Sequence, residues 1–215
     1  AAGRALVGSA PVGVEGTTAW LEAMGTQLGA DRASIDAAIS TQRSAIRAAL
    51  DNNPIDATIT LSGYEGSELL VARLLIESGA TVPYVGSACP KTPHSAADAK
   101  WLEDQGVTVK FRASLEDDLI AMEAFKPDLV IGTTPVVQKA KEASIPSLYF
   151  TNLISARPLM GAAGAGSVAQ VINSALENQP RMLAMESFFE GVGHGQTSGV
   201  WTPEIIARTG AGGIC

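Results

Sequence analysis

The sequence predicts an α/β fold, a Rossmann-like, doubly wound parallel sheet with extra helices at both ends of the chain. From Ile55 onward, short apolar runs alternate with segments of helical periodicity, as in repeated βαβ units. The predicted strands lie at 57–63, 81–87, 107–113, 128–134 and 146–150. Right-handed crossovers between them would place helices on both faces of the sheet.

The helices between these strands are predicted from their apolar periodicity and their end signals. They are expected at 67–79, 95–106, 114–125 and from Pro135 onward. Ser114 and Asp117 have the spacing of a capping box, and Pro135 suits the first position of a helix.

The two ends of the chain are predicted to be mainly helical. Residues 1–53 would contain a strand end and a helical pair from a preceding domain, with Thr17 or Thr18 capping the first helix. Residues 54–165 would form the Rossmann-like domain, and residues 166–215 C-terminal helices and a tail. Of the C-terminal helices, one would begin near Val168 and another after Pro180. We expect the Gly-, Thr- and Ser-rich tail from Gly191 to be mobile or to pack on a partner.

Composition excludes several classes of protein. The chain has 215 residues, 46% of them hydrophobic and 17% charged, which favours a folded core over disorder. A net charge of -7 argues against nucleic-acid or anionic-lipid partners. The uncharged stretch 145–156 is too short and too polar to span a membrane.

The number of cysteines bears on the cellular compartment of the protein, and the first residue bears on whether the chain was processed. Two cysteines, Cys89 and Cys215, cannot form a disulfide framework, so we expect a reducing, cytoplasmic compartment. The chain begins with Ala1 and lacks a basic-then-apolar leader, which suggests a processed chain or a piece of a longer one.

In a doubly wound sheet, ligands bind beyond the carboxyl ends of the strands. The loops at 62–67, 86–95 and 132–135, together with the stretch 149–172, are therefore the candidate binding loops. Glu65 and Arg157 are the charged residues best placed over this edge, although surface salt bridges would also explain them.

Other candidate sites have simpler explanations. Residues 161–167 (GAAGAGS) are glycine-rich, but their spacing is not that of a dinucleotide fingerprint, so the small residues more simply permit close helix packing. Cys89 could be a metal ligand, a redox thiol or an inert packed thiol. His94 and His194 lack partners at zinc-ligand spacing. No catalytic residue and no metal ligand is assigned.

Three stretches, 10–25, 126–172 and 186–195, together resemble the carboxyl-terminal half of a catalytic component of the nitrogenase-like oxidoreductase component 1 family. The resemblance is to the branch that serves bacteriochlorophyll synthesis in photosynthesis, and its middle block is specific. It implies ATP-dependent, ferredoxin-linked reduction of a ring double bond in the chlorin chlorophyllide a.

The resemblance also implies partners and a cofactor. An ATP-hydrolysing iron–sulfur reductase component would pass electrons to a heterotetramer that includes a Z subunit and holds a four-iron four-sulfur cluster. The family's cluster cysteines lie in the amino-terminal half of the subunit, and no cysteine precedes Cys89 here. The resemblance therefore implies that this chain alone holds no complete cluster and is inactive alone.

The same resemblance suggests substrate-binding residues. In nitrogenases, the loop that corresponds to the stretch 149–172 carries a histidine that binds the metal cofactor. Matching residues 157–164 (RPLMGAAG) to the family's loop places this position at about Thr151. With no histidine there, an iron–molybdenum type cofactor is not expected. The residues that would line or edge a pigment pocket are Phe150, Thr151, Asn152, Leu153, Arg157 and Met160. Arg157 would pair with a pigment carboxylate.

Two other functions remain open from the sequence. The chain could be a non-catalytic module that binds a small molecule or metal chelate, or a nucleotide-sugar transferase lobe, because both classes use doubly wound domains.

Overall fold

The computed structural model describes residue 7 and residues 10–188. Its helices are α1 (Gly13–Leu28), α2 (Arg32–Asp51), α3 (Glu68–Glu77), α4 (Ala96–Asp104), α5 (Leu115–Phe125), α6 (Thr134–Glu142), α7 (Phe150–Ser155), α8 (Gly161–Leu176) and α9 (Gln179–Phe188). Its strands are β1 (Thr58–Gly63), β2 (Thr81–Ser87), β3 (Thr108–Phe111), β4 (Leu129–Gly132) and β5 (Ser147–Tyr149). Most of the predicted N-terminal strand end and the whole tail, with His194 and Cys215, lie outside the described residues.

The five strands form one parallel sheet in the order β3-β2-β1-β4-β5. Leu61 of the central strand β1 is paired with Val85 of β2 on one side and with Ile131 of β4 on the other. Because the strand order changes direction between β1 and β4, the switch point of the sheet lies there. The predicted doubly wound fold is confirmed.

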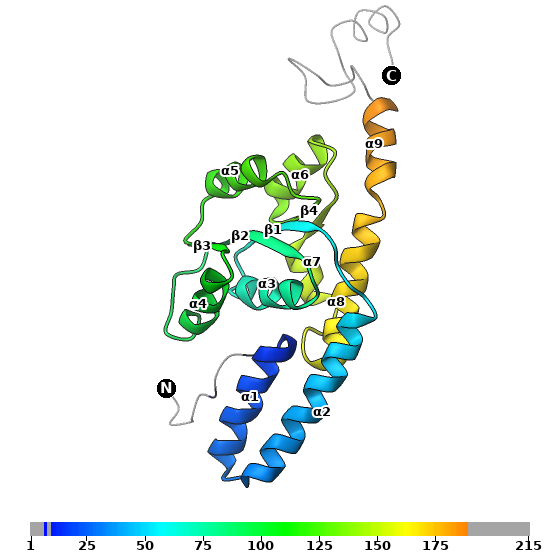
Figure 1. Cartoon of the computed structure of the whole chain (residues 1–215). Coiled ribbons are helices and arrows are strands. Elements are labelled where there is room, and N and C mark those ends of the chain that lie inside the picture. Colours follow the sequence, from blue (N-terminus) through cyan, green and yellow to red (C-terminus); the bar gives the residue numbers. More distant parts are fainter. Residues whose placement is uncertain (1–6, 8–9, 189–215) are drawn as a thin grey trace, which may run out of the picture. The chain divides into compact units, whose positions relative to one another are not determined.

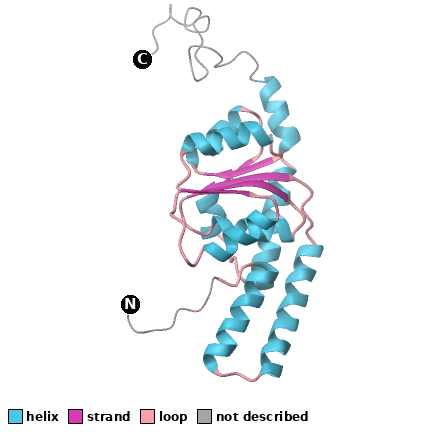
Figure 2. Cartoon of the chain, turned by 60° about the vertical axis from the view of Figure 1, so that its left-hand side comes forward, coloured by secondary structure: helices cyan, strands magenta, loops and turns pink. Residues whose placement is uncertain are grey.

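Helices cover both faces of the sheet, with α5 and α6 on one face and α3 and α4 on the other (Figures 1 and 2). All four residues of β4 are buried, as expected for a strand covered on both faces. The largest fully buried apolar side chains are Phe150, Ile46, Ile55, Ile59, Leu61, Leu74, Leu75, Leu102, Leu129, Ile131 and Ile172. This core joins the sheet, α3, α2 and α8.

The N-terminal helical pair packs on the Rossmann-like part. The helix α1 contacts α3, and α2 contacts α8, within one compact unit that extends to Gln179. The start of α8 at Gly161 means that the predicted boundary at residue 165 falls inside a helix. The assignment of residues 1–53 to a preceding domain stays a prediction. The predicted helix after Pro180 is present as α9.

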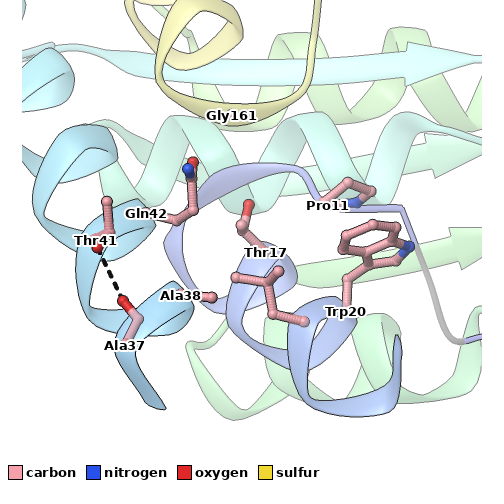
Figure 3. Close-up of a pocket in the computed structure, with 9 residues that line it drawn as sticks. Pro11, Thr17, Trp20, Ala37, Ala38, Thr41, Gln42 and Gly161 are labelled. Atoms are coloured by element: carbon pink, nitrogen blue, oxygen red, sulfur yellow. Dashed lines mark hydrogen bonds between the residues drawn. The ribbon is translucent and has the colours of Figure 1, made fainter. Parts of the chain in front are cut away.

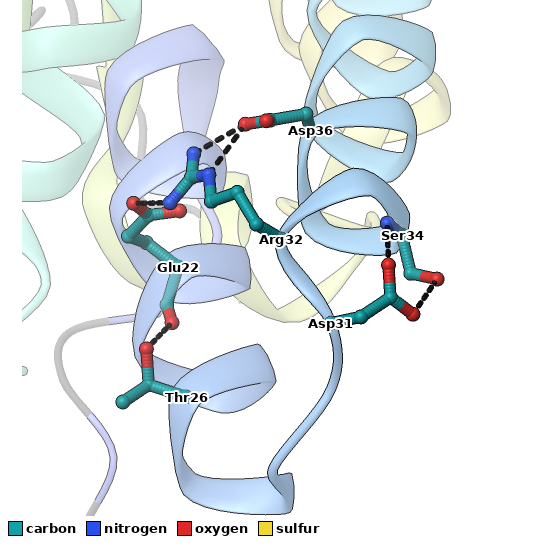
Figure 4. A network of polar contacts seen from close by, with 6 residues as sticks. All are labelled: Glu22, Thr26, Asp31, Arg32, Ser34 and Asp36. Carbon is teal, nitrogen blue, oxygen red and sulfur yellow. Dashed lines mark hydrogen bonds and ion pairs between the residues drawn. The ribbon is translucent and has the colours of Figure 1, made fainter.

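A polar network at the turn between α1 and α2 fixes this hairpin (Figure 4). Asp31 caps α2, because its side chain accepts a hydrogen bond of 2.9 Å from the Ser34 N–H. Hydrogen bonds from Ser34 lower the pKa of Asp31. Arg32 forms ion pairs with Glu22 of α1 and Asp36 of α2, which link the two helices across the turn.

The cap of α1 differs from the prediction. Thr17 and Thr18 lie inside α1, which begins four residues before Thr17, at Gly13. The carboxylate of Glu77, at the end of α3, accepts hydrogen bonds from the N–H groups of Val14 (2.5 Å) and Glu15 (3.0 Å). The prediction was wrong because the acceptor comes from a distant helix. The capping box at Ser114, by contrast, is confirmed.

A buried carboxyl group, Asp118, joins α5 to the sheet. Its Oδ1 accepts a hydrogen bond of 2.8 Å from the Tyr84 hydroxyl of β2. A Cβ atom at Gly86 would lie only 2.2 Å from the same oxygen, so glycine is needed at this position of β2. Burial raises the pKa of Asp118 to about 6.

This pKa predicts a pH-dependent stability. The folded carboxyl keeps its proton to higher pH than the unfolded one, so the free energy of unfolding should fall as pH rises from about 4 to 6. The Asp118 contribution is about 2 to 3 kcal/mol over this window. Asp118→Asn keeps an acceptor for Tyr84 and should flatten this part of the profile, as measured by urea unfolding at several pH values. The pKa of Glu77 is also raised by burial, so the difference between variant and wild type isolates Asp118. Parallel pH profiles for the two proteins would contradict the prediction.

Candidate functional site

Three loops meet at the carboxyl edge of the sheet. The hydroxyl Oγ1 of Thr151, just after β5, lies 3.1 Å from Glu65 Oε1 and 3.3 Å from the Tyr64 hydroxyl, both in the loop after β1. The thiol of Cys89, after β2, lies 3.5 Å from the carbonyl oxygen of Tyr64. We call Tyr64, Glu65, Cys89 and Thr151 the edge cluster. It combines a phenol, a carboxylate, a thiol and a hydroxyl at the position where doubly wound folds bind ligands.

Hydrogen bonds to the side chain of Glu68, which is fully buried, fix the loop that carries Tyr64 and Glu65. Its Oε1 accepts hydrogen bonds from the N–H groups of Glu65 (2.7 Å) and Gly66 (3.2 Å), and its Oε2 accepts one from the Ser87 hydroxyl (2.9 Å). A buried carboxylate needs such donors to offset its lost hydration. The loop after β1 therefore has a fixed backbone.

Close packing beneath this loop requires a glycine at the end of β1. A Cβ atom at Gly63 would lie 2.6 Å from Glu68 Oε1 and 2.8 Å from Cδ1 of Phe150. The carboxylate and the aromatic ring thus occupy the space that a side chain at this position would fill.

The predicted substrate-binding residues divide into two groups. Phe150 and Leu153 of α7 are buried, with 1% and 4% of their surface exposed, and pack in the core. Thr151, Asn152, Arg157 and Met160 are exposed. The structure brings Thr151 together with Glu65, whereas the Nη1 atom of Arg157 lies 3.3 Å from the Ser167 hydroxyl of α8. Four of these residues, Phe150, Thr151, Asn152 and Leu153, lie on the short helix α7.

The glycine-rich segment is helical. Residues 161–167 form the first turns of α8 and do not follow a strand directly, unlike a phosphate-binding loop. A Cβ atom at Gly166 would lie 3.5 Å from the Ala49 Cβ of α2, which agrees with the prediction that small residues permit close packing here.

Metal-binding groups are sparse in the part of the chain that the structure describes. No group of three or more His, Cys, Asp or Glu side chains is arranged to hold a metal ion there. Cys89 is a free, partly buried thiol, and His94 is exposed in the turn before α4. One thiol does not supply the four ligands of a four-iron four-sulfur cluster, so these residues do not fit that group by themselves.

An apolar hollow of about 500 Å³ lies between α1, α2 and the start of α8 (Figure 3). It is lined by Pro11, Thr17, Trp20, Leu21, Ala37, Ala38, Thr41, Gln42 and Gly161. Sequence reasoning did not find it, because its wall depends on how three helices pack. Across residue 7 and residues 10–188, we find no helix with the length and apolar character that a bilayer crossing requires.

The fold is that of nitrogenase component 1 proteins. A solved structure described as "Nitrogenase Cp1 at pH 6.5" superposes with a TM-score of 0.59 at 21% identity, covering 79% of this chain and 39% of that chain. A second, "Nitrogenase Cp1 at pH 5", gives a TM-score of 0.60 at 14% identity, covering 81% and 42%. At these identities the likeness concerns the fold alone.

The sequence comparisons are more specific. A family model described as nitrogenase component 1 type oxidoreductase matches residues 1–177, and the chain belongs to this family. The "Chlorophyllide reductase 52.5 kDa chain" of Cereibacter sphaeroides is 67% identical over 201 residues, which are 94% of this chain and 40% of that protein. The protein of the same name from Rhodobacter capsulatus is 64% identical over 207 residues, 95% of this chain and 42% of that protein. The chain thus spans about two fifths of these relatives' length.

The role of Glu68 can be tested by substitution. Glu68→Ala leaves the N–H groups of Glu65 and Gly66 and the buried Ser87 hydroxyl without their acceptor, and should lower the free energy of unfolding by about 2 to 4 kcal/mol. Glu68→Gln keeps one carbonyl acceptor and should be less destabilising. Urea unfolding measures both, with Glu123→Ala, an exposed glutamate of α5, as the matched control expected within about 0.5 kcal/mol of wild type. Equal effects of Glu68→Ala and the control would rule out the supporting role.

Proposed function

We propose that the chain is part of the catalytic component of a chlorophyllide reductase, which reduces a ring double bond of chlorophyllide a in bacteriochlorophyll synthesis. The observation that carries this proposal is the identity of 67% and 64% to two chlorophyllide reductase chains, over nearly the whole length of this chain. The family is an oxidoreductase family, so the chain is an enzyme component rather than a passive binding module.

The proposed substrate wall is the carboxyl edge of the sheet with the segment from Phe150 to Met160. Phe150 and Leu153 would support this wall from the core, because both are buried. Thr151, Asn152, Arg157 and Met160 would face the pigment, because they are exposed. A large, flat and mostly apolar macrocycle suits a wall with few polar groups at fixed positions.

The proposal includes partners and cofactors held by other protein. An iron–sulfur cluster would be bound in the full complex, with ligands outside the described residues, and it would supply electrons there. A Z subunit would complete the catalytic component, and ATP would bind to a separate iron–sulfur reductase component. The two-cysteine composition favours a reducing compartment, and we place the assembly in the cytoplasm.

Arg157 provides the test of the substrate wall. In the assembled complex, Arg157→Ala should weaken chlorophyllide binding about tenfold, because a charge-assisted hydrogen bond to a pigment carboxylate is lost. Absorbance titration of the pigment measures the dissociation constant, and the melting temperature reports the fold. Arg47→Ala removes another exposed guanidinium, on α2, and should leave binding unchanged. Unchanged affinity in Arg157→Ala would remove this residue from the site.

A further inference from the structure

We propose that Glu65 is the acid that delivers a proton to the ring carbon of the chlorin during reduction, with Thr151 orienting its carboxyl group. This inference rests on the proposed function and concerns the same edge of the sheet. It is carried by the meeting of two segments 86 residues apart, where the Thr151 hydroxyl contacts Glu65 Oε1 at 3.1 Å.

The position of Glu65 is set by its backbone as well as by its side chain. The Glu65 N–H donates to the buried Glu68 carboxylate at 2.7 Å, so the loop cannot shift without breaking this hydrogen bond. The Thr151 hydroxyl occupies one carboxyl oxygen, and the other has no hydrogen-bond partner among the described residues. The hydrogen bond to Thr151 thus fixes the orientation of an exposed carboxyl group whose second oxygen has no such partner. This carboxyl group can present a proton in a constant direction.

The neighbouring groups are less suited to this role. The titratable groups that contact this part of the loop are Tyr64, Cys89 and Glu68. A carboxyl group is a stronger acid than a phenol or a thiol, so its protonated form gives up a proton to a ring carbon more readily. Glu68 is fully buried, and both of its oxygens accept hydrogen bonds from the protein. Glu65 is therefore the exposed carboxylic acid of the edge cluster.

Reduction of one carbon–carbon double bond consumes two electrons and two protons, and the electrons come from the iron–sulfur protein of the assembly. The O–H bond of Glu65 breaks as a C–H bond forms at one ring carbon with the electron pair of the reduced ring. The second proton comes from water, which also reprotonates the exposed Glu65 carboxylate.

The experiment uses the complete complex with its reductase component, ATP and chlorophyllide a. Glu65→Gln keeps the shape of the side chain and its acceptor for Thr151 but has no acidic proton. We expect its single-turnover rate of product formation to fall at least about 100-fold, with the pigment dissociation constant within about threefold of wild type. Glu65→Asp, which restores an acid, should recover part of the rate. Glu123→Gln, an exposed glutamate near the end of α5, is the matched control and should behave as wild type.

The outcomes separate this inference from the proposed function. A single-turnover rate of Glu65→Gln within threefold of wild type would overturn the proton-donor role. A lost rate that is explained entirely by weaker pigment binding would overturn it as well. In both cases a wild-type complex that reduces chlorophyllide would leave the proposed function standing. A wild-type complex that neither binds nor reduces the pigment would overturn both. Equal melting temperatures of the variants exclude misfolding as the cause of a lost rate.

Discussion

The carboxylate of Glu68 is the constraint on which the candidate site depends. It lies in the first turn of α3, where the helix dipole favours a negative charge, and it is completely buried. Buried charges persist only when they are fully hydrogen-bonded, and this one accepts from two loop N–H groups and from Ser87 of β2. It therefore ties the ends of β1 and β2 to α3 and leaves no room for a side chain at Gly63.

The helix α3 uses a second carboxylate in a similar way at its other end. Glu77 accepts hydrogen bonds from the first N–H groups of α1, which otherwise lack partners at a helix start. The same helix also packs on β2 and α4. The helix α3 thus connects the sheet, the loop of the edge cluster and the N-terminal hairpin. It does so through the carboxylates of Glu68 and Glu77 and through its buried apolar side chains.

Local patterns predicted the order of strands and helices, because apolar periodicity and end signals such as Ser114 with Asp117 act over a few residues. They failed where the partner is distant. The cap of α1 comes from Glu77, and the six-residue helix α7 is too short to show a period. The general rule for doubly wound folds pointed to the carboxyl edge of the sheet, where the edge cluster lies. It did not predict that Thr151 would meet Glu65, because that contact depends on the exact packing of β5 beside β4.

The composition of the edge cluster indicates what kind of ligand it suits. Nitrogenase structures share the fold at 14% and 21% identity, which leaves the side chains of the edge free to differ. Here the edge presents a hydroxyl at Thr151, a carboxyl at Glu65 and a phenol at Tyr64, which exchange protons and hydrogen bonds. Within the described residues they form no set of three or more metal ligands. The edge cluster therefore suits a ligand that forms hydrogen bonds with these groups at the carboxyl edge of the sheet.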